Sequence, residues 1–353
     1  MNKRFREYGF NPGLLPTGSR NTIADVKGVR VGHLTRIEGN DVRTGLTLVD
    51  PGIQNLYAQK IPSAIAIENG AGKVAGISEV EEFGFLRAPV ALTNTHAVGA
   101  VMQGVIDLVG RQTALPFYGS VNTVVGEVND AILNNIHKRS IEPEDVSLAF
   151  ENLSEDIALG CVGGGTGTRA FTWKGGIGSA SRVVEVSGRT YTVGILVQTN
   201  FGGSLTIMGV PIGRLLGVED SSTHPIFKRD GSCIIVLATD APLTSRQLKR
   251  LAKRSFLGVA RTGSIVPTAS GDYAIAFSTN RSGLEGTGDI GTCLSDDALN
   301  PLFLACVESV EESVYDALFT AETMTGRDGN VLEALPKDRV VKILKRVQKT
   351  YDA

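Results

Sequence analysis

Short apolar runs, separated by turn-forming residues, recur along the whole chain. Few polar residues alternate with the apolar ones, which is typical of strands that are buried on both faces. The pattern therefore predicts buried strands, and these are "VRVGHL" (29–34), "LTLVD" (46–50), "AIAI" (64–67), "PVALTN" (89–94), "VGILVQT" (193–199), "CIIVLATD" (233–240) and "YAIAFST" (273–279).

Longer segments repeat their apolar residues with the period of a helix, at 244–261, 300–321 and 337–350. The first of them opens with a capping box made by Thr244 and Gln247. Its polar face is basic, which we interpret as a solvated face, with a patch for an anionic ligand as the alternative. No repeat or linker divides the chain, so strands and helices mixed in this way indicate one α/β domain over residues 1–353.

Composition excludes several classes of protein. The 353 residues are 42% hydrophobic with a formal net charge of −2, so neither a nucleic-acid partner nor a membrane anchor is indicated. The first residues lack the apolar segment of a signal peptide, and no stretch approaches the roughly 18 apolar residues of a membrane span. The four cysteines are scattered, which predicts no disulfide framework. We expect a soluble, cytoplasmic protein.

Signatures of metal-dependent and nucleotide-dependent chemistry are weak. There is no G-x-S-x-G or H-E-x-x-H motif, and the four histidines have no ligand spacing. The stretch "NGAGKVAG" (69–76) resembles the end of a phosphate-binding loop, but Val74 stands where Ser or Thr would bind magnesium. The run "GGGTGT" (163–168) is too short for a dinucleotide fingerprint. We therefore expect neither a metal nor a cofactor.

One serine is placed unusually, between a glycine and an unbroken apolar run. Ser232 follows Gly231 and begins the predicted strand at 233–240. It could cap an ordinary turn, since Gly-Ser before a strand is common. It could also be a nucleophile whose base is its own α-amino group, once the peptide bond before it is cut. An α-amino group has a pKa of about 7.7–8.0, suited to general-base catalysis near neutral pH.

The stretch "DGSCIIVLATDAPLTSRQLKRLAKR" (230–254) resembles the self-processing junction of the L-aminopeptidase/D-esterase and β-peptidyl aminopeptidase family. The likeness extends over almost the whole chain. Further stretches similar to the family follow in its order, namely "NTIADVKGVRVGH" (21–33), "NGAGKVAGISEVEEFG" (69–84), "APVALTNT" (88–95), "VGGGTGTRAFTWKGGIGSASR" (162–182) and "SGDYAIAFSTN" (270–280). Long motifs in one order are much more specific than a single tripeptide.

The resemblance implies an N-terminal-nucleophile-hydrolase-like fold, a four-layer αββα sandwich. It also implies that the precursor cuts itself into an α chain (1–231) and a β chain (232–353), which stay together and assemble into a tetramer of heterodimers. The substrate would be a small peptide or amide with a free amino terminus.

Individual residues match the family's site. Ser232 matches the nucleophile, and Ser270 with Asp272 matches the pair that orients it and its amino group. Asn200 matches the amide donor to the oxyanion, and Glu127 matches the carboxylate that binds the substrate ammonium. Each has a simpler explanation: Asn200 and Asp272 suit turns, and a buried Glu127 could pair with an internal cation.

One position departs from the family's pattern. Close relatives carry an aromatic hydroxyl two residues beyond the carboxylate, where this chain has Asn129. Asn129 could donate an N–H to the oxyanion instead, or the site could be tuned to other substrates. Two alternatives to a self-processing aminopeptidase remain: an acyltransferase of the ornithine acetyltransferase-like fold, and an unprocessed homologue without catalytic activity.

Overall fold

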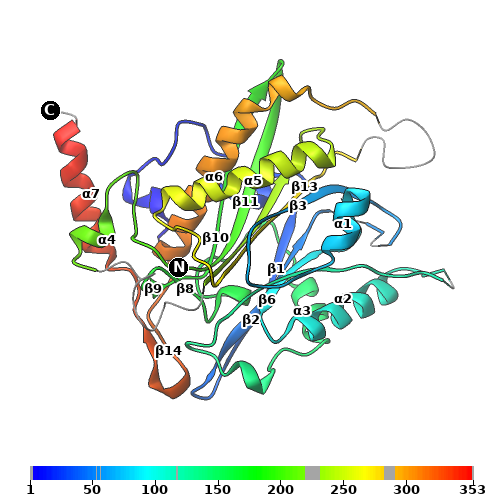
Figure 1. Ribbon diagram of the computed structural model, residues 1–353, viewed down its shortest axis with the longest axis horizontal. Coiled ribbons are helices and arrows are strands. Elements are labelled where there is room, and N and C mark those ends of the chain that lie inside the picture. The colour runs from blue at the N-terminus through cyan, green and yellow to red at the C-terminus, as the bar shows by residue number, and fades with distance from the viewer. Residues whose placement is uncertain are drawn as a thin grey trace.

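The computed structural model describes residues 3–52, 54–55, 57–116, 118–218, 231–281 and 291–351. Two β-sheets lie face to face at its centre (Figure 1). The first sheet has the strand order β1 (Arg30–Glu38), β2 (Val42–Asp50), β6 (Val90–Asn94), β7 (Val124–Val128) and β4 (Val74–Ala75). The second has the order β10 (Ile177–Val186), β11 (Arg189–Asn200), β12 (Gly231–Thr239), β13 (Ser270–Ser278), β3 (Ile61–Gly70) and β5 (Phe85–Leu86).

Helices cover the outer face of each sheet. The helices α2 (Val98–Gln112) and α3 (Asp145–Glu151) pack on the first sheet, and α5 (Ser245–Arg261) and α6 (Asn300–Thr320) pack on the second. The four layers form the αββα sandwich that the family resemblance implies. The helix α7 (Lys337–Tyr351) lies at one end of the molecule, away from the layers (Figure 1). Two short helices complete the set in the described residues, α1 (Ile77–Phe83) and α4 (Ile212–Leu215).

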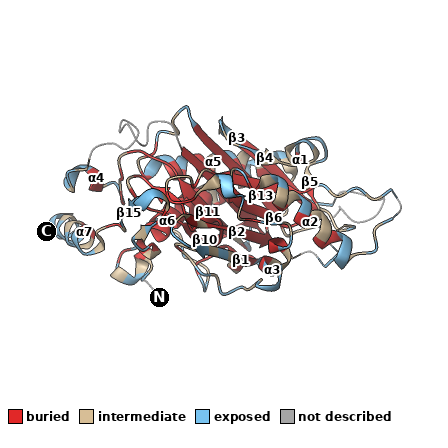
Figure 2. Ribbon diagram, turned by 90° about the horizontal axis from the view of Figure 1, so that it is seen from below, coloured by how far each residue is buried: buried red, intermediate tan, exposed pale blue. Residues whose placement is uncertain are grey.

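The position of the predicted strand at 233–240 in the fold explains why its sequence is apolar throughout. Odd positions such as Ile235 and Leu237 pack in the core under α5 and α6. Even positions such as Ile234 and Val236 pack in the core shared with the first sheet. Because both faces of β12 are buried between layers, neither face needs polar side chains. The buried residues concentrate in the middle of the stack, as Figure 2 shows.

The other predicted elements are present, with differences at their ends. The capping box of α5 forms, since Thr244 Oγ1 accepts a hydrogen bond from the Gln247 amide at 3.3 Å. The basic face of this helix makes surface ion pairs, for example Lys249 with Glu81 at 2.6 Å, which fits the solvated interpretation. Among the described residues, no helix is long and apolar enough to cross a membrane.

The predicted helix at 300–321 is buried on more than its apolar face. Glu308, Glu312 and Asp316 lie four residues apart along α6, on one side of it, and all three are buried. The N-terminal segment covers this side and supplies cations: Arg4 contacts Asp316 at 2.6 Å, and Arg6 contacts Glu312 at 2.6 Å. The acidic side of an apparently amphipathic helix therefore contacts the protein and not solvent.

Candidate active site

Ser232 lies where three strand ends meet. The strands β12 and β13 are parallel, so their amino-terminal ends lie at the same edge of the sheet, and the antiparallel β11 ends there too. Ser232 is therefore opposite Asn200 on one side and Gly271 on the other. Its side chain is buried, and its Oγ donates a hydrogen bond to the carbonyl oxygen of Gly231 at 2.5 Å. The hydroxyl thus lies against the peptide group that precedes it.

Two glycines separate this hydroxyl from Glu127. A Cβ added to Gly271 would lie 3.3 Å from Ser232 Oγ and 2.6 Å from the Cα of Gly72. A Cβ added to Gly72 would lie 3.3 Å from Glu127 Oε1. The Ser232 hydroxyl and the Glu127 carboxylate therefore lie on either side of one pair of glycines in close contact.

Glu127 is a buried carboxylate on β7, with 3% of its side chain exposed. Its Oε1 accepts hydrogen bonds from the backbone N and the Nζ of Lys73, at 3.0 and 3.1 Å. Lys73 Nζ also donates to Thr95 Oγ1 at 2.7 Å, and its side chain is 56% exposed. The internal cation considered for Glu127 is therefore Lys73, which reaches it from the solvent side.

Asn200 connects the two sheets. Its Nδ2 donates to the carbonyl oxygen of Asn129 at 2.8 Å, and its Oδ1 accepts from the Arg169 amide at 3.4 Å. The side chain of Asn129 caps a turn, because its Oδ1 accepts a hydrogen bond from the Ala131 amide at 3.0 Å. Asn200 and Asn129 are thus brought together beside Ser232, with the carbonyl of Asn129 as their point of contact.

Ser270 and Asp272 lie on the other face of the sheet from the Ser232 side chain. In the β12–β13 pairing, Ser270 is opposite Gly231 and Asp272 is opposite Cys233, and paired residues share a face. A Cβ added to Gly231 would lie 2.9 Å from Ser270 Oγ. Ser270 is therefore next to Gly231, on the side of the Ser232 amide nitrogen, and Asp272 is next to Cys233, both on the face away from the Ser232 side chain.

The environment of Asp272 favours the neutral carboxyl. Burial raises its pKa from 3.8 to about 7, the nearby Ser270 hydroxyl lowers it in part, and the charge of Glu68 raises it. Within the described part of the chain, neither Asp272 Oδ2 nor Ser270 Oγ has a well-formed hydrogen bond. Such a pair of buried oxygens is an electrostatic environment that would stabilise an added cation.

Sequence reasoning missed two residues of the site. The sequence suggested Lys73 only as the lysine of a phosphate-binding loop, whereas in the structure it makes an ion pair with Glu127. Tyr273 lies beside Gly72, and burial, followed by the charges of Glu127 and Asp272, raises its pKa. Its hydroxyl donates to the carbonyl of Gly72 at 2.7 Å and so fixes the close glycine contact. The alternating pattern of β13 could have placed Tyr273 on the same face of the sheet as the Ser232 side chain.

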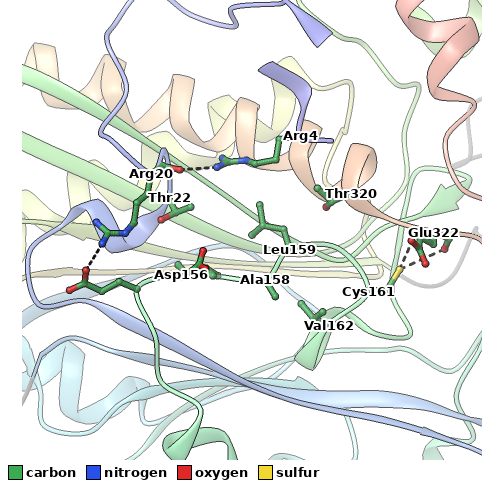
Figure 3. Close-up of a pocket in the computed structure, with 12 residues that line it drawn as sticks. Arg4, Arg20, Thr22, Asp156, Ala158, Leu159, Cys161, Val162, Thr320 and Glu322 are labelled. Atoms are coloured by element: carbon green, nitrogen blue, oxygen red, sulfur yellow. Dashed lines mark hydrogen bonds and ion pairs between the residues drawn. The ribbon is translucent and has the colours of Figure 1, made fainter. Parts of the chain in front are cut away.

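A cavity of about 520 Å³ lies apart from these residues (Figure 3). Arg4, Arg20, Glu155 and Cys161 are among the residues that line it, and Ser232 is not. Arg20 makes an ion pair with Glu155 at 2.8 Å across it. No group of three or more potential metal ligands occurs in the described residues.

Comparisons with known proteins identify similar sequences and structures. The model of peptidase family S58 matches residues 21–332. The chain is 36% identical to the beta-peptidyl aminopeptidase BapA of Sphingosinicella microcystinivorans, over 94% of this chain and 89% of that protein. This match and the family model support an aminopeptidase-type hydrolase.

Two solved structures cover 98% of this chain and 99% of their own. One is a Burkholderia sp. beta-aminopeptidase, with 35% identity and a TM-score of 0.89. The other is the L-aminopeptidase D-Ala-esterase/amidase of Ochrobactrum anthropi, with 34% identity and a TM-score of 0.90, described as a prototype for the serine aminopeptidases and a variant of the Ntn hydrolase fold. They confirm the predicted fold and a serine aminopeptidase or amidase over the acyltransferase alternative. The chain therefore belongs to peptidase family S58.

Proposed function

We propose that the chain cuts itself between Gly231 and Ser232, and that Ser232 then hydrolyses short peptides, amides or esters that have a free amino group. The observation that carries this proposal is the contact of Ser232 Oγ with the Gly231 carbonyl, next to the unfilled Ser270 and Asp272 pair. A serine that only capped a turn would need neither feature.

The self-cleavage proceeds through an ester. Ser232 Oγ attacks the carbonyl carbon of Gly231, the C–N bond breaks, and the acyl group moves from nitrogen to oxygen. Water then hydrolyses the ester, which leaves a carboxylate on Gly231 and an ammonium group on Ser232. A side chain at position 231 would crowd Ser270 Oγ, which favours glycine there. The products are an α chain of residues 1–231 and a β chain of 232–353.

The new amino group is the base of the enzyme. It forms next to Ser270 and Asp272, whose free oxygens suit an ammonium ion. When it is neutral, it accepts the proton of Ser232 Oγ, and an ordinary α-amino pKa of about 7.7–8.0 suits this role. Ser270 and Asp272 are positioning residues, because they act on this amino group from the face opposite the hydroxyl.

The substrate is held from two sides. The Asn200 amide has two N–H groups and gives one of them to the Asn129 carbonyl, so the other is available for the oxyanion. Glu127 binds the substrate ammonium, since its Oε1 accepts both hydrogen bonds from Lys73 and no hydrogen bond in the described structure ends on its Oε2. Exopeptidase specificity follows because a blocked amine cannot satisfy a buried carboxylate.

Assembly and location complete the proposal. The family resemblance supports a tetramer of processed heterodimers, and light scattering with size-exclusion chromatography tests it. The four cysteines are all unpaired, which supports a reducing compartment such as the cytoplasm.

Mass spectrometry tests the self-cleavage. The wild-type protein should give two species with masses that correspond to a cut before Ser232. Ser232→Ala should give one chain of 37.3 kDa, whereas Ser264→Ala, a serine outside the site, should be cut normally. Two fragments in Ser232→Ala would mean that another protease, or another bond, is responsible.

A further inference from the structure

A buried carboxylate and an exposed ammonium lie next to each other at the substrate end of the site. Lys73 Nζ is 3.1 Å from Glu127 Oε1 and 2.7 Å from Thr95 Oγ1, which accounts for two of its three N–H donors. The side chain of Lys73 is 56% exposed, so the third donor can face solvent or a ligand. The backbone N of Lys73 also donates to Oε1, at 3.0 Å, which fixes the residue beside the carboxylate.

The two oxygens of Glu127 are used unequally. Both hydrogen bonds from Lys73 end on Oε1, and none from the described residues ends on Oε2. A substrate ammonium can therefore bind Oε2 without displacing Lys73. For a substrate whose only charge is that ammonium, Lys73 would be a repulsive neighbour, and it would weaken binding. Its presence favours a substrate that offers it a negative charge.

Adjacent carboxylate and ammonium groups are complementary to a zwitterion. The matching ligand has its ammonium and its carboxylate on the same carbon, so that each group meets its opposite. In an ordinary α-aminoacyl substrate, that carbon carries the scissile carbonyl and has no free carboxylate. A zwitterionic acyl group therefore requires that the scissile carbonyl belong to the side chain of the amino acid.

We propose that the site is built for β-aspartyl peptides and amides, with Glu127 binding the α-ammonium and Lys73 the α-carboxylate. This inference rests on the proposed function, because it assumes that Glu127 faces the substrate amine. A β-aspartyl group is β-alanyl with one carboxylate added on the amine-bearing carbon. It is thus a β-aminoacyl group, the kind of substrate that the names of two relatives indicate for those proteins.

The pair of β-aspartyl and β-alanyl p-nitroanilides tests the role of Lys73. The wild-type enzyme should have a kcat/KM at least about tenfold higher for the β-aspartyl compound, mostly through KM. Lys73→Met should remove this preference and raise the rate on the β-alanyl compound, because a repulsive charge is lost. Lys249→Met is the matched control, since Lys249 makes a half-exposed ion pair with Glu81 at 2.6 Å outside the site. It should leave both values unchanged.

A binding measurement makes the test independent of turnover. Calorimetry on the processed wild type should give a lower Kd for free aspartate than for β-alanine, and Lys73→Met should abolish the difference. The inference would be overturned if the wild type hydrolysed the β-aspartyl compound no faster than the β-alanyl compound, or if the preference persisted in Lys73→Met. In either case, activity on the β-alanyl compound would still uphold the proposed function. Loss of activity on both compounds with no aspartate preference would overturn both.

Discussion

Replacing Asp272 in a chain that cannot cut itself should show how much the buried carboxyl of Asp272 lowers the stability of the fold. The comparison is Ser232→Ala against Ser232→Ala with Asp272→Asn. In the uncut chain Asp272 is almost fully buried, and within the described residues its Oδ2 has no hydrogen-bond partner. Asparagine has nearly the same shape and cannot ionise, so the two proteins differ mainly in the charge at position 272.

The magnitude follows from the pKa of Asp272 in the fold, which burial raises from 3.8 to about 7. Between these values the folded state holds a proton that the unfolded state has released, so raising the pH destabilises the fold. The free energy of unfolding therefore contains its full contribution from protonated Asp272 below pH 3.8, and this contribution is lost as the pH rises through about 7. A gap of about 3 pH units at 1.36 kcal/mol each predicts a loss of about 4 kcal/mol relative to the asparagine variant.

Urea unfolding at intervals from pH 4 to pH 8 measures this difference. The free energy of unfolding of Ser232→Ala should fall relative to the double variant by about 1.4 kcal/mol per pH unit between pH 4 and about pH 7, and should then level off. Wild type that has been processed should show a smaller loss, because the ammonium of Ser232 would then neutralise Asp272. Parallel curves for the two uncut variants would refute the electrostatic reasoning.

Further changes separate packing, assembly and specificity. Arg182→Met should lower the free energy of unfolding by about 3–5 kcal/mol, because Arg182 is fully buried with two carboxylates. Arg246→Met, which breaks an exposed ion pair, should lower it much less, and equal losses of the two variants in urea unfolding would contradict this. Gly271→Ala should lower kcat/KM at least about tenfold, since its methyl group would lie 2.6 Å from a neighbouring backbone Cα, whereas Gly99→Ala, with open space around it, should keep full activity. Glu127→Gln should lower kcat/KM on free-amine substrates about 30- to several-thousand-fold yet leave self-cleavage intact, and an unchanged ratio between free and N-acetylated substrates would exclude it from the site.

The layered fold could be predicted because strands that are buried on both faces have uninterrupted apolar sequences. The strand at 233–240 is apolar throughout for this reason. By contrast, β7 was not predicted as a strand, since its five residues include Gly126 and Glu127. A glycine and a charged residue weaken the strand pattern. Here Gly126 is packed against the core side chain of Ile234, and Glu127 is hydrogen-bonded to Lys73.

The residues of the site could be listed from the sequence, but their arrangement could not. Ser232, Ser270 and Asp272 appear to form one group until the parallel register of β12 and β13 is known. That register puts Ser270 opposite Gly231 and Asp272 opposite Cys233, on the face away from the Ser232 side chain. Register depends on contacts between strands that lie about 40 residues apart, and a single sequence contains no direct record of them.

The buried charges around α6 explain how a chain cut at position 231 would stay assembled. Each carboxylate of this cluster lies after the cut, and each cation lies before it. Arg182 contacts Glu308 at 3.0 Å and Glu312 at 2.7 Å, and Arg4 contacts Asp316 at 2.6 Å. Separating the two chains would have to break each of these ion pairs together with the packing around them. These ion pairs would therefore help to keep the fold intact if the peptide bond at the amino-terminal end of β12 were cut.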